Sequence, residues 1–283
     1  MLEAVVNVSE GRDPVRLRAI GAAAGSALLD VHSDPDHHRT VFTVAAAESA
    51  RTEAATRRLV DVACEDLDLR DHQGVHPRLG IVDVVPFVAL GPTPADIAVS
   101  AAHAFGAWLV REHAIPVFFY GDAAPDHRTL PSVRRDAFTR RAPDLGPDTP
   151  HPRFGATAVG ARPPLVAVNV ELASADLQLA KTIARETRER DGGLLGVRTL
   201  GLALESRGTV QVSMNLVDLA ATGIERACSE VRDRAHVRDV QVARVELVGL
   251  MPAAELARCS DRFRGWSGLD ESSTIEARVN APR

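Results

Sequence analysis

The chain has 283 residues, of which 45 % are apolar and 25 % charged, an ordinary balance for a globular protein. This length allows one large domain or two smaller ones, each with its own hydrophobic core. The net charge of −5 gives no reason to expect nucleic acid as a partner. Lys181 is the only lysine among 33 cationic residues, and since arginine binds carboxylates with two hydrogen bonds, acidic small molecules are plausible ligands.

The cysteines and the N-terminal sequence indicate a reducing compartment. Cys64, Cys228 and Cys259 are far apart and odd in number, so we expect reduced packing residues and not a disulfide framework. The start of the chain lacks the basic and apolar regions of a signal peptide. Because no apolar run is long enough to cross a bilayer, we expect a soluble, cytoplasmic protein without membrane partners.

The first half of the chain alternates between strand and helix patterns. Strand patterns are β-branched or apolar runs, and helix patterns repeat apolar residues every three or four positions. Asp13 is a candidate N-cap with Pro14 at the first helical position, and Pro86 indicates a bulge or a sheet edge. The predicted elements are a strand and turn at 3–11, a helix at 13–25, strands at 27–32 and 39–47, a helix at 48–67 and a strand at 81–90.

An added helix and strand follow, at 94–113 and 116–120, and then an irregular, proline-rich stretch, 121–155. The six-element order then recurs, with a strand at 164–172, a helix at 174–190 ended by Gly192 and Gly193, a hairpin of 196–205 and 208–218, a helix at 222–237, a strand at 240–250 and a terminal helix. The order βαββαβ is typical of ferredoxin-like domains. The sequence predicts an α+β fold of two tandem ferredoxin-like subdomains, 1–163 and 164–283, with a ligand-binding cleft between them.

Three histidines and two aspartates fall within HSDPDHHR, residues 32–39, and both types bind metals. His37 and His38 are adjacent, so they point to opposite faces of an extended chain. His72 and His76 are four residues apart, but the glycine between them and the proline that follows disfavour a zinc-binding helix. We therefore expect no metal. Two interpretations stay open, a solvated turn in which aspartates cap backbone amides and a metal-free catalytic role.

The loop HQGVHPRLG leads into the strand at 81–90. His76 is followed there by proline and Arg78. Polar residues at the mouth of a strand are often functional, although a single loop histidine is usually only a surface residue. The loop is therefore a candidate for chemistry.

Two further stretches carry small or polar residues. GATAVGAR contains Gly155 and Gly160, which suits either close approach of the backbone to a flat ligand or a tight strand crossover. Gln211, Ser213 and Asn215 share one face of a strand by its two-residue period. Such a face is either exposed to solvent or the wall of a cleft.

Seven stretches in chain order resemble the formiminotransferase domain of glutamate formiminotransferases: NVSEGRD, LLDVHSDPDHHRTVFTV, HQGVHPRLGIVDVVPF, GATAVGAR, GVRTLG, VQVSMNL and VGLMP. The resemblance runs from about Val5 to the C-terminal helix. The family has two ferredoxin-like subdomains, which agrees with the tandem pattern. Animal members carry a fused cyclodeaminase domain, for which 283 residues leave no room, so we expect a stand-alone form.

The resemblance implies transfer of the formimino group of N-formimino-L-glutamate to N5 of tetrahydrofolate, a reaction of histidine degradation and one-carbon metabolism, by a homodimer. It places the catalytic histidine of the family's H-P-R loop at His76, and histidine can act as general acid and base near neutral pH. Since both substrates carry carboxylates, arginines should line the site. The residues expected to bind substrate or folate are Asn7, His32, Asp34, Arg39, Arg78, Gly155, Ala156, Thr157, Gly160, Arg162, Arg198, Gln211, Ser213 and Asn215.

The chain departs from the animal members at four positions around the expected site. His32 replaces an aspartate, His38 an asparagine, Val75 a glutamate and Pro163 a lysine. These changes keep two alternatives open, formyl transfer between 5-formyltetrahydrofolate and glutamate, and a folate-binding homologue without catalysis.

Overall fold

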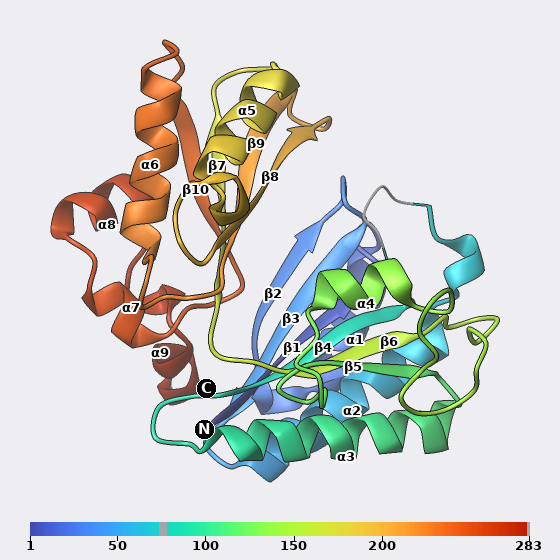
Figure 1. Cartoon of the computed structure of the whole chain (residues 1–283). Coiled ribbons are helices and arrows are strands. Elements are labelled where there is room, and N and C mark those ends of the chain that lie inside the picture. Colours follow the sequence, from blue (N-terminus) through green and yellow to red (C-terminus); the bar gives the residue numbers. More distant parts are fainter. Residues whose placement is uncertain (74–77, 282–283) are drawn as a thin grey trace. The chain divides into compact units, whose positions relative to one another are not determined.

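The computed structural model describes residues 1–73 and 78–281, so the candidate catalytic residue His76 lies outside the described residues. The chain divides into two compact units, unit 1 from Met1 to Pro163 and unit 2 from Pro164 onward (Figure 1). Each unit has its own sheet and its own buried apolar core.

Unit 1 contains a six-stranded mixed sheet in the order β2-β3-β1-β4-β6-β5. The strands β2, β3, β1 and β4 are antiparallel neighbours, and β6 runs parallel to both β4 and β5. Its elements are β1 (Leu2–Val8), α1 (Pro14–Ala23), β2 (Leu28–Asp34), β3 (Arg39–Ala46), α2 (Ser49–Asp66), β4 (Val82–Ala89), α3 (Ala95–His113), β5 (Val117–Gly121), α4 (Leu130–Asp136) and β6 (Thr157–Ala161).

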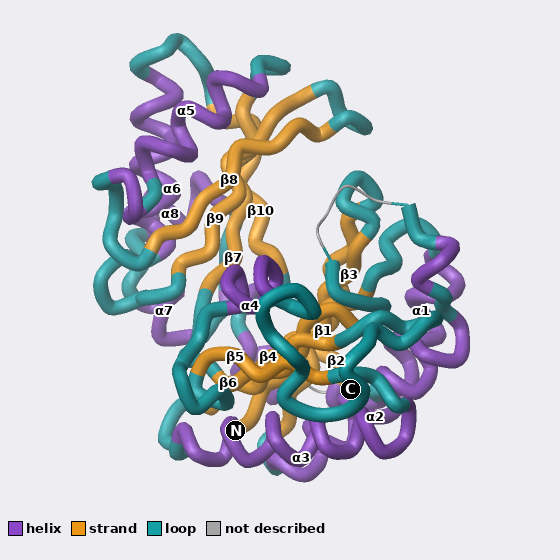
Figure 2. Tube along the Cα trace, turned by 45° about the vertical axis from the view of Figure 1, so that its right-hand side comes forward, coloured by secondary structure: helices purple, strands orange, loops and turns teal. Residues whose placement is uncertain are grey.

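The two faces of this sheet are covered differently. Helices α1, α2 and α3 pack on one face, where they bury side chains such as Val6, Phe42 and Phe87. Helix α4 lies on the other face, where Val133 packs against Val84 and Phe118 (Figures 1 and 2). Because α4 has only seven residues, it covers only part of that face, which also carries polar side chains such as Asn7 and Arg39.

Three features of unit 1 differ from the sequence-based prediction. Helix α4 lies within the stretch expected to be irregular, and β6 is a strand inserted between β4 and β5. Pro86 lies in a central strand and not at an edge, since β4 is paired on both sides. The register shift is at Asp83, because Val82 and Val84 pair with consecutive residues of β1 and Asp83 is the extra residue between them.

Unit 2 contains a four-stranded antiparallel sheet in the order β10-β7-β9-β8, with α5 and α6 packed on one face. Its elements are β7 (Val166–Leu172), α5 (Leu177–Thr187), β8 (Val197–Leu204), β9 (Thr209–Leu216), α6 (Ile224–His236) and β10 (Val242–Val248), followed by α7 (Ala253–Ala257), α8 (Asp261–Ser267) and α9 (Ile275–Asn280). The two βαββαβ sets confirm the predicted α+β fold of two tandem subdomains. The expected terminal helix is three short helices instead.

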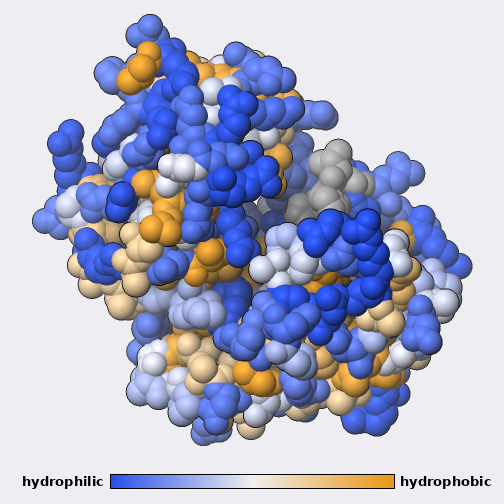
Figure 3. Space-filling view, viewed as in Figure 1, coloured by the Kyte–Doolittle hydropathy of each residue, from blue (hydrophilic) through white to orange (hydrophobic). Residues whose placement is uncertain are grey.

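The surface is mostly hydrophilic on the face shown in Figure 3, with hydrophobic residues in small separate groups. Among residues 1–73 and 78–281, no helix has the length and apolar character needed to span a membrane.

Helix α6 begins without a side-chain cap of its own, because its N-cap residue is Gly223. The buried carboxylate of Glu255, from α7, takes that place and accepts a hydrogen bond from the Ile224 N–H at 2.6 Å. A Cβ at position 223 would lie 2.6 Å from Glu255 Oε1, so a side chain there would displace the carboxylate from this position. Burial raises the pKa of Glu255, although the Ile224 N–H and Arg258 oppose this effect.

We expect Glu255→Ala to lower the free energy of unfolding by about 1–2 kcal/mol, because a helix cap is lost. Glu255→Gln keeps an acceptor oxygen and serves as the matched control. Since the pKa is higher in the folded than in the unfolded state, the wild type loses stability relative to Glu255→Gln as pH rises through the folded-state pKa. Urea unfolding at pH 4 and pH 7 measures both effects, and equal stability of the Ala and Gln variants would contradict the capping role.

Candidate active site

The segment HSDPDHHR forms the end of β2, a tight turn and the start of β3. Residues directly opposite in an antiparallel pair share a face, and Asp34 pairs with Arg39, His32 with Val41, and Val41 with Asn7. Val6 and Phe42 point to the face covered by α1, α2 and α3, so these side chains point to the other face, where α4 packs. The structure thus brings four predicted site residues together on one sheet face: Asn7, His32, Asp34 and Arg39.

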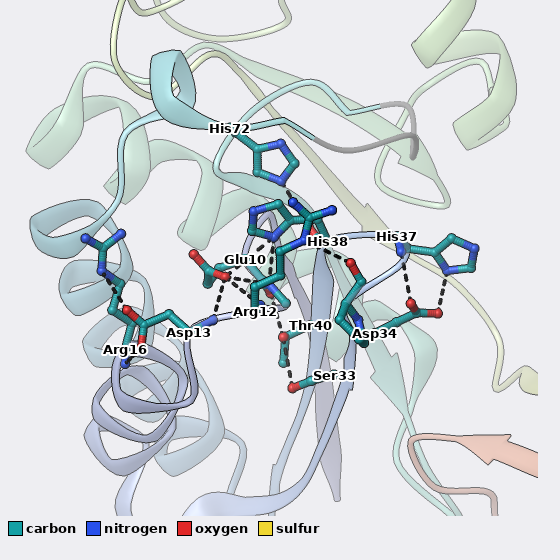
Figure 4. A network of polar contacts seen from close by, with 12 residues as sticks. Glu10, Arg12, Asp13, Arg16, Ser33, Asp34, His37, His38, Thr40 and His72 are labelled. Carbon is teal, nitrogen blue, oxygen red and sulfur yellow. Dashed lines mark hydrogen bonds and ion pairs between the residues drawn. The ribbon is translucent and has the colours of Figure 1, made fainter. Parts of the chain in front are cut away.

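Asp34 and His37 hold the turn closed. The Asp34 carboxylate accepts a hydrogen bond from the His37 backbone N–H at 2.9 Å and contacts the His37 ring nitrogen Nδ1 at 2.7 Å (Figure 4). Burial acts to raise the pKa of Asp34, but the hydrogen bonds from His37 outweigh it and lower the pKa to about 2. Asp34 is therefore ionised at neutral pH, and its charge faces Arg39.

The turn is fitted against the segment that follows β1. One oxygen of the buried Glu10 carboxylate accepts hydrogen bonds from three successive backbone N–H groups, those of residues 11–13. A Cβ at Gly11 would lie 2.5 Å from the backbone nitrogen of Arg39, so only glycine permits this approach. The positions of Asp34 and Arg39 consequently depend on Gly11.

His38 and His72 stack with ring centroids 4.2 Å apart. His38 Nδ1 accepts the Gly11 N–H at 3.0 Å, and His72 Nε2 lies 3.0 Å from the His38 carbonyl oxygen, to which it must donate. Burial lowers the pKa of both rings, so both are neutral near pH 7. One nitrogen of each ring thus contacts a backbone group, and His38 Nδ1 also lies 3.5 Å from Glu10 Oε1. The described part of the chain contains no group of three or more side chains that could hold a metal ion.

The strand entry after the H-P-R stretch is held by several hydrogen bonds. The Leu79 N–H donates to Asp83 Oδ1 at 2.7 Å, and the Gly80 carbonyl accepts from the Ser9 hydroxyl at 2.8 Å. The Ile81 N–H donates to the Phe154 carbonyl at 3.0 Å. Arg78, the first described residue after His76, is half-buried. Burial lowers the pKa of Arg78, and the negative charge of Asp83 opposes this effect. The exit of the loop is therefore fixed in the sheet.

Asp83 and Arg134 form an ion pair that the sequence analysis missed. Asp83 is only 1 % exposed, and its two carboxylate oxygens lie 2.5 and 3.3 Å from the two terminal nitrogens of Arg134. Arg134 comes from α4, the helix that had not been predicted. An acidic residue within the apolar run IVDVVPF was the available signal, because a buried carboxylate requires a partner.

Tyr120 and Arg162 occupy the neighbouring part of the same face. The buried Tyr120 hydroxyl is hydrogen bonded to the Arg162 side chain, and burial raises the pKa of Tyr120 to about 12 although Arg162 opposes the shift. Gly160 lies on the strand next to Tyr120, and a Cβ there would lie 2.5 Å from the ring. Gly160 thus makes room for the ring of Tyr120, which gives this glycine a structural role.

Packing and hydrogen bonds within unit 1 also involve Gly155, Ala156 and Thr157. Gly155 has φ +73°, and a Cβ there would lie 2.8 Å from Gly80 Cα. Ala156 is fully buried, and the Thr157 hydroxyl donates to the Val82 carbonyl at 2.7 Å. These contacts join β6 to β4, as in a tight strand crossover. Contact of these residues with folate stays a prediction.

The remaining predicted residues belong to unit 2. Arg198 pairs with Asn215 across β8 and β9, and Gln211, Ser213 and Asn215 alternate with the core residues of β9. All four point away from α5 and α6. Arg198 and Asn215 are exposed, whereas Gln211 is 1 % exposed. The structure gathers them on one face of the second sheet, and their binding role stays a prediction.

Comparison with known proteins matches both units to one family. The model of the formiminotransferase domain, N-terminal subdomain, matches residues 1–162, and that of the formiminotransferase domain matches residues 167–279. Glutamate formimidoyltransferase of Thermoplasma acidophilum is 35 % identical and is aligned over 99 % of this chain and 97 % of its own. The same-named protein of Streptococcus pyogenes is 36 % identical over 93 % of each.

A longer relative matches over part of its length. Formimidoyltransferase-cyclodeaminase of Rattus norvegicus is 35 % identical over 90 % of this chain, which spans 51 % of that protein. Together, the two family models and the end-to-end similarity to these relatives show that the chain belongs to the formiminotransferase domain family.

Proposed function

We propose that the protein is a glutamate formimidoyltransferase that moves the formimino group of N-formimino-L-glutamate to N5 of tetrahydrofolate. The observation that carries this proposal is the match along nearly the whole length to two proteins that bear the name glutamate formimidoyltransferase. The chain's own residues support it, because arginine side chains on one face of unit 1 suit substrates with several carboxylates.

The transfer makes one carbon–nitrogen bond and breaks another. Folate N5 attacks the formimino carbon to give a tetrahedral intermediate, and N5 loses its proton. The bond from that carbon to the glutamate nitrogen then breaks, and the nitrogen gains a proton as glutamate leaves. One residue can accept the first proton and donate the second if its pKa is near neutrality. We assign this role to His76 from the H-P-R sequence.

Asp34 is suited to a supporting role in this reaction. Its carboxylate stays ionised throughout the working pH range, since its pKa is about 2. It closes the turn that carries Arg39 and contributes negative charge beside that guanidinium. His32 occupies the position at which animal members of the family carry an aspartate, and it lies on the same sheet face as Asp34. Asp34 therefore places a carboxylate close to the position of that aspartate.

The wider setting follows from the same proposal. Tetrahydrofolate would be a co-substrate and not a resident cofactor, and the reaction would serve histidine degradation in the cytoplasm. We also propose that two copies of the chain form a dimer.

Purified protein supplied with N-formimino-L-glutamate and tetrahydrofolate should yield glutamate and 5-formiminotetrahydrofolate, which mass spectrometry detects. Replacing the donor by 5-formyltetrahydrofolate and glutamate tests formyl transfer as an alternative. Faster formation of N-formylglutamate, or tight folate binding without turnover of either donor, would overturn the proposal.

His76→Ala should lower kcat by about 10²–10⁴-fold, the usual contribution of general acid–base catalysis. His236→Ala, at an exposed position on α6 in unit 2, is the matched control and should keep wild-type activity. Turnover by His76→Ala at the control rate would remove His76 from this role.

A further inference from the structure

His38 lies in the turn between β2 and β3 and is fastened from two directions. Its Nδ1 accepts the Gly11 N–H at 3.0 Å, its carbonyl oxygen lies 3.0 Å from His72 Nε2, and the two rings stack (Figure 4). The backbone of His38 has φ +52°, a left-handed conformation that residues other than glycine rarely adopt. His38 therefore joins the turn to the segment that follows β1 and to the segment that leads to the H-P-R stretch.

The contact with Gly11 requires a neutral ring in one tautomer. Because a backbone N–H is always a donor, Nδ1 of His38 is the unprotonated nitrogen and the proton is on Nε2. A second proton would go onto Nδ1, and two donors would then face each other at 3.0 Å. The Gly11 backbone has little room to give way, since a Cβ there would lie 2.5 Å from the Asp34 carbonyl oxygen and the Arg39 nitrogen. Protonation therefore displaces the ring or the turn.

The surroundings of the ring favour its neutral form. Burial lowers the pKa of His38, and His72, Arg12 and Arg78 act in the same direction. Glu10 opposes them, because its Oε1 lies 3.5 Å from Nδ1. That oxygen already accepts three backbone N–H groups, so it is a poor additional acceptor for a protonated ring. The ring consequently takes up its second proton only below the ordinary histidine value of about 6.5.

The turn that His38 fastens carries two residues expected to bind substrate, Asp34 and Arg39. The Asp34 carboxylate is engaged within the turn by the backbone N–H and the ring of His37. Arg39 directly follows His38, and its backbone nitrogen lies in the close approach to Gly11. A displacement of His38 therefore moves Arg39 as well.

We infer that His38 is a positioning residue of the candidate site, whose neutral ring holds the turn of Asp34 and Arg39 against Gly11 and whose protonation releases that turn and weakens substrate binding. This role rests on the proposed function for the identity of the substrates. It gives one histidine of HSDPDHHR a use that needs neither a metal nor contact with substrate.

Two substitutions separate the acceptor from its titration. His38→Asn supplies an amide oxygen in place of Nδ1 that does not titrate, and asparagine tolerates the left-handed backbone. His38→Ala removes the acceptor. His127→Asn is the matched control, because His127 also has a positive φ, +48°, belongs to unit 1 and has an exposed side chain.

The KM of each substrate is measured between pH 7.5 and pH 5. For at least one substrate, we expect the KM of the wild type to rise roughly 2- to 10-fold more than that of His38→Asn, the range for one hydrogen bond. At pH 7.5, His38→Ala should raise this KM by a similar factor, and His38→Asn should restore it. The pH profile of kcat should be common to all variants, since they share His76, and His127→Asn should behave as the wild type. Parallel KM profiles of the wild type and His38→Asn would overturn the inference.

The tautomer of His38 is measured without any ligand. Long-range ¹H–¹⁵N NMR spectra distinguish the two ring nitrogens, and the signals that His38→Asn lacks identify those of His38. We expect an unprotonated Nδ1 at pH 7.5 and protonation only below pH 6.5. A proton on Nδ1 at pH 7.5 would overturn the inference.

Urea unfolding separates the role of His38 from the proposed function, because it needs no substrate. Since the pKa of His38 is lower in the folded than in the unfolded state, its contribution to stability is complete above the unfolded-state pKa and is lost as pH falls toward the folded-state pKa. We expect the wild type to lose stability relative to His38→Asn between pH 7 and pH 5. Absence of wild-type turnover together with this loss would overturn the function and support the positioning role. Turnover with equal losses in both proteins would do the reverse.

Discussion

The arrangement of unit 1 depends on one buried carboxylate. Taking Asp83 out of water has a large cost in free energy, which only close, well-directed partners can offset. The structure provides them from two directions, a backbone N–H at the entry of β4 and a guanidinium group from α4. Because removal of either partner would leave a buried charge, the sheet and the helix on its polar face are coupled.

This coupling explains why unit 1 is larger than a minimal ferredoxin-like domain. The first four strands and two helices already complete the βαββαβ order, and α3, β5, α4 and β6 are additions. The added strands extend the sheet beyond β4, and the added helix α4 covers part of the face that α1 and α2 leave open. The additions thus supply Tyr120, Arg134 and Arg162, three polar residues of the candidate site.

The sequence was most informative where local patterns and local structure agree. The Asp13-Pro14 helix start was confirmed, with the Asp13 side chain accepting from two backbone N–H groups, because capping depends on neighbouring residues alone. The grouping of His32, Asp34 and Arg39 was also predictable, since a hairpin and its alternation determine which residues share a face.

Features that depend on distant residues were not predictable in the same way. Helix α4 has only seven residues and a Pro131 within its first turn, so its periodicity is weak and the ion pair with Asp83 helps to define it. Strand β6 is rich in small residues, and its sequence therefore lacks a typical strand pattern. Its Gly160 is explained by the ring of Tyr120, which leaves no space for a side chain there. A single sequence shows neither contact, and the role of His76 rests on family resemblance.

The cap that Glu255 provides for α6 has a consequence for the order in which unit 2 can be completed during synthesis. The last strand of its sheet ends at Val248, yet the first turn of α6 obtains its acceptor only when residue 255 is available. Residues 251 and 273–275 are then joined by backbone hydrogen bonds. A nascent chain in which only the four strands and two helices have been synthesised therefore lacks the acceptor for the Ile224 N–H at the start of α6. The short C-terminal helices are thus integral parts of the folding unit.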